Sequence, residues 1–189
     1  MNTLPIKSHG SPGFTLIEVL ITLVIIAIGL LGLAGLQVFS LQSQLEAYQR
    51  AQAVMLAEEM VNRIRVNAPA ARAGAYTPGV EYGLLTPAVC DPATQTTAEY
   101  DLCDWNNILA GQDVLAGGVN AGSVNAARGC IENVVGSIDG ETRILVTVAW
   151  QGAVATASPD LDCGFNAYGD NDAFRRVVAI EAVLADLVN

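Results

Sequence analysis

Histidine is almost absent from this chain, because His9 is the only one among 189 residues. Neither an HExxH pattern nor a glycine-rich loop ending in Gly-Lys occurs. Histidine-dependent nucleophiles, zinc hydrolases and nucleotide-phosphate loops all need such residues. Acids are many, but no pair stands out for carboxylate catalysis. We therefore expect a protein that is not an enzyme and that needs no cofactor.

Basic residues are also scarce, with nine Lys and Arg against nineteen Asp and Glu and a formal net charge of −10. The imbalance lies in the second part of the chain, where fifteen acids and five arginines follow Arg65. An acidic surface repels phosphate groups. We expect neither nucleic acid nor anionic lipid headgroups among the ligands of this part.

One long apolar run extends from Phe14 to Leu36 and contains a single charged residue, Glu18. As a helix the run spans roughly 34 Å, enough to cross a bilayer once. It is longer than the apolar region of a cleaved secretory signal, so we expect a retained anchor. Lys7 precedes the run and an acidic domain follows it, which places the N-terminus in the cytoplasm.

Glu18 is out of place in a plain anchor. At the centre of a membrane helix an acid costs about 2.5–3.5 kcal/mol, so an acid there is a functional hypothesis by default. The alternative is an acid that snorkels to the headgroup level.

The sequence GFTLIE at residues 13–18, after a short leader with Lys7, resembles the class III signal of type IV pilins and pseudopilins. The resemblance implies that a prepilin peptidase cuts between Gly13 and Phe14 and methylates the new amine of Phe14. Residues 1–13 would be the cleaved leader. The resemblance also implies that Glu18 pairs with the amine of a neighbouring subunit and aligns the helices during assembly.

Residues 37–67 contain neither Gly nor Pro, so we expect the helix to continue through them and to end at Pro69. Residues 14–36 would form its membrane and assembly half and residues 37–67 its amphipathic half. One face of the second half carries Val54, Ala57, Val61 and Ile64, while Glu59 and Arg63 pair on another face. Residues 51–67 resemble the corresponding helix of PilV-type minor pilins, the type IV pilus modification proteins.

Four cysteines lie beyond the apolar run, where thiols oxidise: Cys90, Cys103, Cys130 and Cys163. An even number predicts two disulfides with three possible pairings. We favour Cys90 with Cys103 and Cys130 with Cys163, because each pair closes a loop between neighbouring elements. A zinc site is the competing interpretation, but CxxC spacing is absent and the single histidine precedes the membrane segment.

Residues 68–189 read as an α+β head that follows a linker of Pro, Gly and Ala at residues 68–80. Thr96 and Glu99 form a predicted capping box for a helix that extends to about Ala110. The apolar face of that helix carries Leu102, Trp105 and Leu109.

Three β-rich segments follow, at residues 130–135, 143–150 and 174–187. They predict an antiparallel sheet packed on the long helix, which makes the fold class α+β with a transmembrane spine helix. The resemblance to pilins implies the same arrangement. The YDL-and-Trp helix at residues 100–105 and the segment 143–152 are again similar to PilV-type proteins.

An oxygen-rich loop between the last two segments contains Asp160, Asp162, Asp170 and Asp172. Such loops can bind calcium, but no EF-hand register is present. We favour a solvated acidic loop.

The resemblance implies a minor pilin of the tip or priming complex of a type IV pilus, with a role in assembly and in adhesion or twitching. A minor pseudopilin of type II secretion is the alternative, and a membrane-anchored enzyme is a remote one. The implied partners are the prepilin peptidase, other minor pilins, the major pilin, the inner-membrane assembly platform and a tip adhesin. The implied location is the bacterial inner membrane with a single span and a periplasmic head, and then the extracellular pilus.

Overall fold

A computed structural model describes residues 13–84, 87–111, 115–116, 119–120, 124–134 and 140–185. By its contacts the chain divides into two compact units, Met1–Ser43 and Gln44–Asn189. The elements in chain order are α1 (Leu16–Val66), α2 (Ala68–Arg72), α3 (Thr97–Leu109), β1 (Leu115–Ala116), β2 (Val119–Asn120), β3 (Arg128–Asn133), β4 (Glu141–Gln151), the short 3-10 helix η1 (Asp170–Asp172) and β5 (Arg175–Ala185).

The second unit begins within α1 and buries one stripe of that helix. The buried side chains are Ala53, Leu56, Ala57, Met60, Val61 and Ile64. The predicted face is therefore correct for three of its four members, but Val54 is only half-buried. At 100° per residue the stripe is centred near Ala57, and Val54 lies at its margin.

Pro69 does not end α1, and this prediction was wrong. The helix ends at Val66, one residue before the expected Asn67, because Asn67 leaves the helical conformation with φ −106° and ψ 41°. Pro69 then stands in the first turn of α2, where a residue without an N–H is tolerated because that N–H has no helical partner. The segment read as a linker is structured, since Ala71 and Tyr76 are fully buried in the core.

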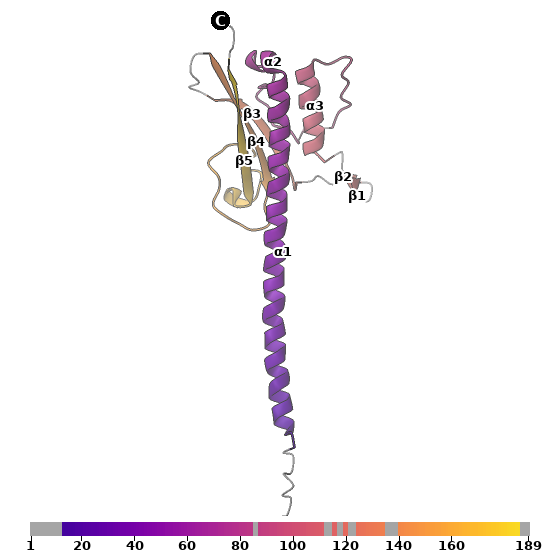
Figure 1. The fold of residues 1–189 in the computed structure, drawn as a ribbon, viewed down its shortest axis with the longest axis vertical. Helices are drawn as coiled ribbons and strands as arrows, with labels where there is room; N and C mark the ends of the chain where they lie inside the picture. The colour runs from indigo at the N-terminus through magenta and orange to yellow at the C-terminus, as the bar shows by residue number, and fades with distance from the viewer. Residues whose placement is uncertain are drawn as a thin grey trace, which may run out of the picture. The chain divides into compact units, whose positions relative to one another are not determined.

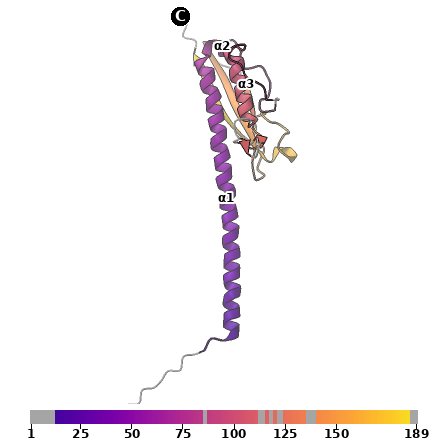
Figure 2. The same cartoon turned by 90° about the vertical axis from the view of Figure 1, so that its right-hand side faces the viewer.

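Strands β3, β4 and β5 form an antiparallel sheet in that order, which confirms the predicted arrangement. The register pairs Cys130 with Thr147 and Thr147 with Ala179. Strands β1 and β2 form a separate two-stranded ladder. Figures 1 and 2 both show α3 lying beside the C-terminal half of α1.

A single apolar cluster joins α1, α3 and the inner face of the sheet. Trp105 is at its centre, fully buried, and its indole Nε1 donates a hydrogen bond to the Leu56 carbonyl at 3.0 Å. Its ring lies 5.6 Å from that of Tyr82. Gly129 of β3 leaves the space for this ring, because a Cβ there would stand 2.3 Å from Trp105 Cη2.

The capping box predicted for α3 is present. The Thr96 hydroxyl accepts from the Glu99 N–H at 3.3 Å, and the Glu99 carboxylate accepts from the Thr96 N–H at 2.8 Å. The three predicted apolar residues of this helix, Leu102, Trp105 and Leu109, are all buried.

Candidate functional site

The N-terminal end of α1 presents Glu18 in the first helical turn. The Thr15 carbonyl accepts hydrogen bonds from the N–H groups of Glu18 and Val19 at 3.1 and 3.3 Å, and the Thr15 hydroxyl donates to Glu18 Oε2 at 3.4 Å. Gly13 and Phe14 precede the helix, and Phe14 is 82% exposed. A carboxylate in this turn is favoured by the positive end of the helix dipole. Phe14 stands four residues before it in the sequence, outside the helix.

Apart from Glu18, the part of α1 in the first unit exposes apolar side chains on all sides of the helix. Large side chains from Leu16 to Leu36 are between 46% and 91% exposed. By length and composition, α1 is the one helix among the described residues that could cross a membrane. A helix that is apolar on every face belongs in lipid or inside a larger assembly.

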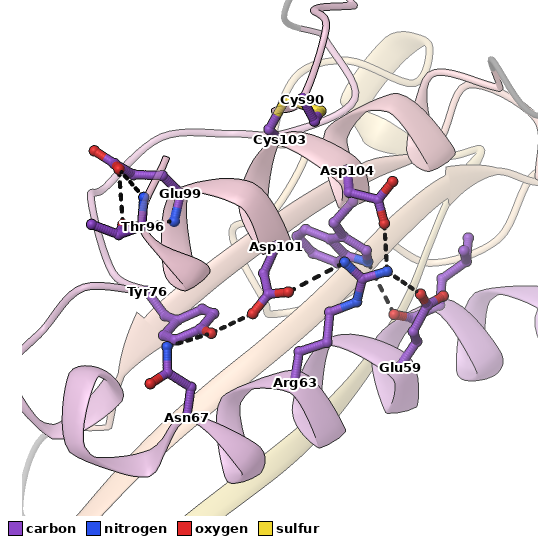
Figure 3. A network of polar contacts seen from close by, with 12 residues as sticks. Glu59, Arg63, Asn67, Tyr76, Cys90, Thr96, Glu99, Asp101, Cys103 and Asp104 are labelled. Atoms are coloured by element: carbon purple, nitrogen blue, oxygen red, sulfur yellow. Dashed lines mark hydrogen bonds and ion pairs between the residues drawn. A yellow bond between two sulfur atoms is a disulfide. The ribbon is translucent and has the colours of Figure 1, made fainter. Parts of the chain in front are cut away.

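In the second unit, Arg63 joins α1 to α3 through three carboxylates (Figure 3). Its guanidinium lies 2.5 Å from Glu59, 2.5 Å from Asp104 and 3.5 Å from Asp101. The predicted Glu59–Arg63 pair is therefore present, but it is part of a contact between two helices. Burial lowers the pKa of Arg63, and the hydrogen bonds to Glu59 and Asp104 outweigh it and raise that pKa.

Tyr76 completes this network from the segment after α2. Its hydroxyl donates to Asp101 Oδ2 at 2.5 Å and accepts from the Asn67 side chain at 3.2 Å. Burial and the bond to Asp101 raise the pKa of Tyr76 to about 12, so the phenol remains a donor at neutral pH. Tyr76 was missed in the sequence because Pro and Gly near it are typical of a linker. Asp101 and Asp104 are three residues apart and share one face of α3. This spacing could have indicated from the sequence that the face binds a basic residue.

The four cysteines are paired as Cys90–Cys103 and Cys130–Cys163, which is the pairing favoured from the sequence. The first bond ties the loop before α3 to that helix, and the second ties β3 to the loop before β5. Among the described residues, one group of three candidate metal-binding side chains lies close together, Glu81 with Cys130 and Cys163. Both sulfur atoms of this group belong to the Cys130–Cys163 disulfide.

Asp172 is not part of a solvated loop, and that interpretation was wrong for this residue. It is 1% exposed, lies 3.2 Å from Arg175 Nε, and accepts from the N–H groups of Asn166 and Tyr168 at 2.8 and 3.3 Å. Burial opposes its ionisation, but these N–H donors and the charge of Arg175 prevail and lower its pKa. Its oxygens therefore bind these N–H groups and the Arg175 guanidinium, and this holds the loop in place.

Arg175 is the ion-pair partner of Asp172, and it holds the same loop. The buried guanidinium donates to the carbonyls of Leu161, Cys163 and Pro159, the last two at 3.0 and 2.9 Å. A charge-assisted set of this kind fixes the loop of residues 158–172 against β5. The calcium hypothesis for Asp160, Asp162 and Asp170 stays a prediction.

The chain thus combines a helix whose first part is apolar and long enough to cross a membrane, one acid in the first turn of that helix, and a disulfide-bonded α+β head. Two family models match the chain. The prokaryotic N-terminal methylation motif matches residues 9–34, and type IV pilin Tt1218 matches residues 35–103. The chain is a type IV pilin-like protein, of a family of structural subunits that associate with other pilins and the assembly machinery.

Searches of curated proteins and of solved structures found no match for this chain.

Proposed function

We propose that this chain is a minor pilin of a type IV pilus, of the PilV kind, and a subunit of the complex that primes assembly at the tip. The observation that carries the proposal is Glu18 in the first turn of α1, four residues after Phe14 and the one charged residue of the apolar run 14–36. This arrangement lies within the matched methylation motif.

The proposed maturation begins with cleavage between Gly13 and Phe14 and methylation of the new amine. Both residues precede the first helical turn, where a peptidase can reach the backbone without unwinding the helix. The resulting ammonium provides the cation that a carboxylate in lipid requires. We infer that Glu18 receives this cation from a neighbouring subunit, so that the pair sets the register between two helices.

The proposed organisation follows from the same steps. Residues 1–13 are the leader, residues 14–36 the membrane segment, residues 37–67 the amphipathic helix and residues 68–189 the head. The subunit first lies in the bacterial inner membrane with its head in the periplasm and then joins the pilus. Its proposed partners are the prepilin peptidase, other minor pilins, the major pilin, the assembly platform and a tip adhesin.

The test is deletion of the gene followed by complementation with the wild-type chain or with Glu18→Ala. The proposal expects the deletion to reduce surface pili and twitching, the wild-type chain to restore both, and Glu18→Ala to enter the membrane without restoring them. Loss of folded-protein export with unchanged pili would instead assign the chain to a type II secretion pseudopilus. Full restoration by Glu18→Ala would contradict the assembly role of that carboxylate.

A further inference from the structure

The two disulfides of the head differ in their exposure to solvent. Cys130 and Cys163 are 6% and 4% exposed and pack in a small apolar cluster. Cys90 and Cys103 are half-buried, and their bond joins an exposed loop to α3 (Figure 3). Thiol–disulfide exchange requires access of an external thiolate to a sulfur atom. Exposure therefore favours exchange at the Cys90–Cys103 bond.

Asn107 of α3 holds the Cys90 end of this bond. Its side-chain amide donates to the Ala88 carbonyl at 2.7 Å and to Cys90 Sγ at 3.3 Å. The amide oxygen accepts from the Ala88 N–H at 3.2 Å, which fixes the orientation of the amide, because a flipped side chain would oppose N–H to N–H. The Ala88 carbonyl also lies 3.6 Å from Cys90 Sγ, but this oxygen already accepts from Asn107. An N–H that donates to sulfur stabilises the thiolate that forms when the bond opens.

The sulfur atoms of the other disulfide have the opposite surroundings. The Glu81 carboxylate lies 4.0 Å from Cys130 Sγ, and the Thr147 carbonyl oxygen lies 3.7 Å from Cys163 Sγ. The full negative charge of the first and the partial negative charge of the second disfavour a thiolate on either sulfur. Exposure and the neighbouring polar groups thus point to the same bond, Cys90–Cys103, as the one that exchanges.

We propose that Cys90–Cys103 is a thiol-exchange site, at which a thiol compound opens the bond and a disulfide compound closes it again. Asn107 is the positioning residue of this site, because it holds Cys90 and stabilises the thiolate that leaves. Exchange is faster when the more stable thiolate leaves, so the external sulfur attacks Cys103.

The exchange takes place in two steps. A thiolate attacks Cys103 Sγ and forms a mixed disulfide there, while the electron pair of the broken bond passes to Cys90 Sγ. A second thiolate attacks the external sulfur of the mixed disulfide and forms an external disulfide, while Cys103 leaves as a thiolate. The protons of the two external thiols end on the two cysteines. The cysteine pair gains two electrons, and the external thiols lose them.

The head stays folded when this bond is open. Buried Trp105 and the ion pairs of Arg63 hold α3 in place, and neither contact involves the disulfide. Asn107 also keeps its contacts with the Ala88 backbone, so the two sulfur atoms remain near each other and the bond can form again. Exchange therefore changes the attachment of the loop at residues 89–95 to α3 and leaves the core intact.

The first test treats the purified full-length chain, in detergent, with reduced glutathione and labels the released thiols for mass spectrometry. We expect the Cys90–Cys103 pair to open at least about tenfold faster than the other pair. Acid-quenched intermediates should contain glutathione on Cys103. Equal opening rates, or adducts mainly on Cys90, would overturn the inference. A parallel reaction with a reduced thioredoxin-type protein shows whether a protein dithiol is the faster reagent at the same bond.

The second test measures the thiolate of Cys90 in a chain with Cys103→Ser, from the pH at which its alkylation reaches half the maximal rate. We expect Asn107→Asp and Asn107→Leu to raise this pH by at least about one unit, because both remove the N–H donor. Asn133→Asp, at an exposed asparagine of β3, is the matched control and should leave it unchanged.

A purely structural role of Asn107 would lower the thermal midpoint and leave the pH of half-maximal alkylation where it is. That result in both Asn107 variants would overturn the assignment of the positioning residue. Both tests use the purified chain, so their outcomes do not depend on whether the proposed pilus function is correct.

Discussion

The contact between Gly129 and Trp105 supports a quantitative prediction about how α3 is held against the sheet. A Cβ at Gly129 would lie 2.3 and 2.6 Å from two Trp105 ring carbons and 2.6 Å from Leu109 Cδ1. Trp105 is 0% exposed and Leu109 3%, so neither side chain can move outward freely. Gly129→Ala should therefore overpack the core.

Overpacking of this kind costs about 1–3 kcal/mol. Replacing a glycine within a strand returns about 0.5–1 kcal/mol. Contacts as short as 2.3 Å place the cost in the upper part of that range, about 2–3 kcal/mol, so we expect a net loss of about 1–2.5 kcal/mol. At about 2–4 °C per kcal/mol for a chain of this size, the thermal midpoint should decrease by about 2–10 °C. The assay is near-ultraviolet circular dichroism of the full chain in detergent, which follows the packed tryptophans of the head.

A double-mutant cycle with Trp105→Phe is the control. The smaller ring makes room for the new methyl group, so the double variant should be more stable than the sum of the single effects by at least about 0.5 kcal/mol. A neutral or stabilising Gly129→Ala, or additive effects in the cycle, would refute the reasoning.

Three further predictions concern the rest of the head. Replacing Cys130 and Cys163 together by Ser should lower the free energy of unfolding by about 4 kcal/mol in urea titrations. The same change at Cys90 and Cys103 should lower it by about 3 kcal/mol, because this pair closes the shorter loop. Equal losses would contradict this order. Tyr76→Phe should cost about 1.5–3 kcal/mol in the same assay, as Asp101 loses a buried donor, and an unchanged unfolding midpoint would exclude that role. The folded-state pKa of Asp172 is below its ordinary value of 3.8, so its stabilising contribution is present above pH 3.8 and is lost as the pH falls further. Asp172→Asn should therefore flatten the dependence of the free energy of unfolding on pH below 3.8. An unaltered pH dependence would argue against a stabilising Asp172–Arg175 ion pair.

Local signals predicted much of the fold. The Thr96–Glu99 capping box depends on residues three apart, and the strand segments depend on β-branched composition, so both were visible in the sequence. The disulfide pairing followed from loop closure between adjacent elements.

The misses share a different physical origin, because each depends on a partner distant in sequence. Tyr76 packs in the apolar cluster and donates to Asp101, 25 residues away, although its own neighbours resemble a linker. Asp172 is buried because backbone turns at Asn166 and Tyr168 direct N–H groups at it. Pro69 was read as a helix end, whereas the backbone break at Asn67 allows a new helix to begin with that proline.

The N-terminus of the chain in purified, sheared pili is the measurement that tests the central claim most directly. The account predicts a peptide that starts with N-methylated Phe14 in this fraction, recovered by mass spectrometry in far smaller amounts than the major pilin. A chain that is absent from sheared pili, or that retains residues 1–13 there, would contradict it.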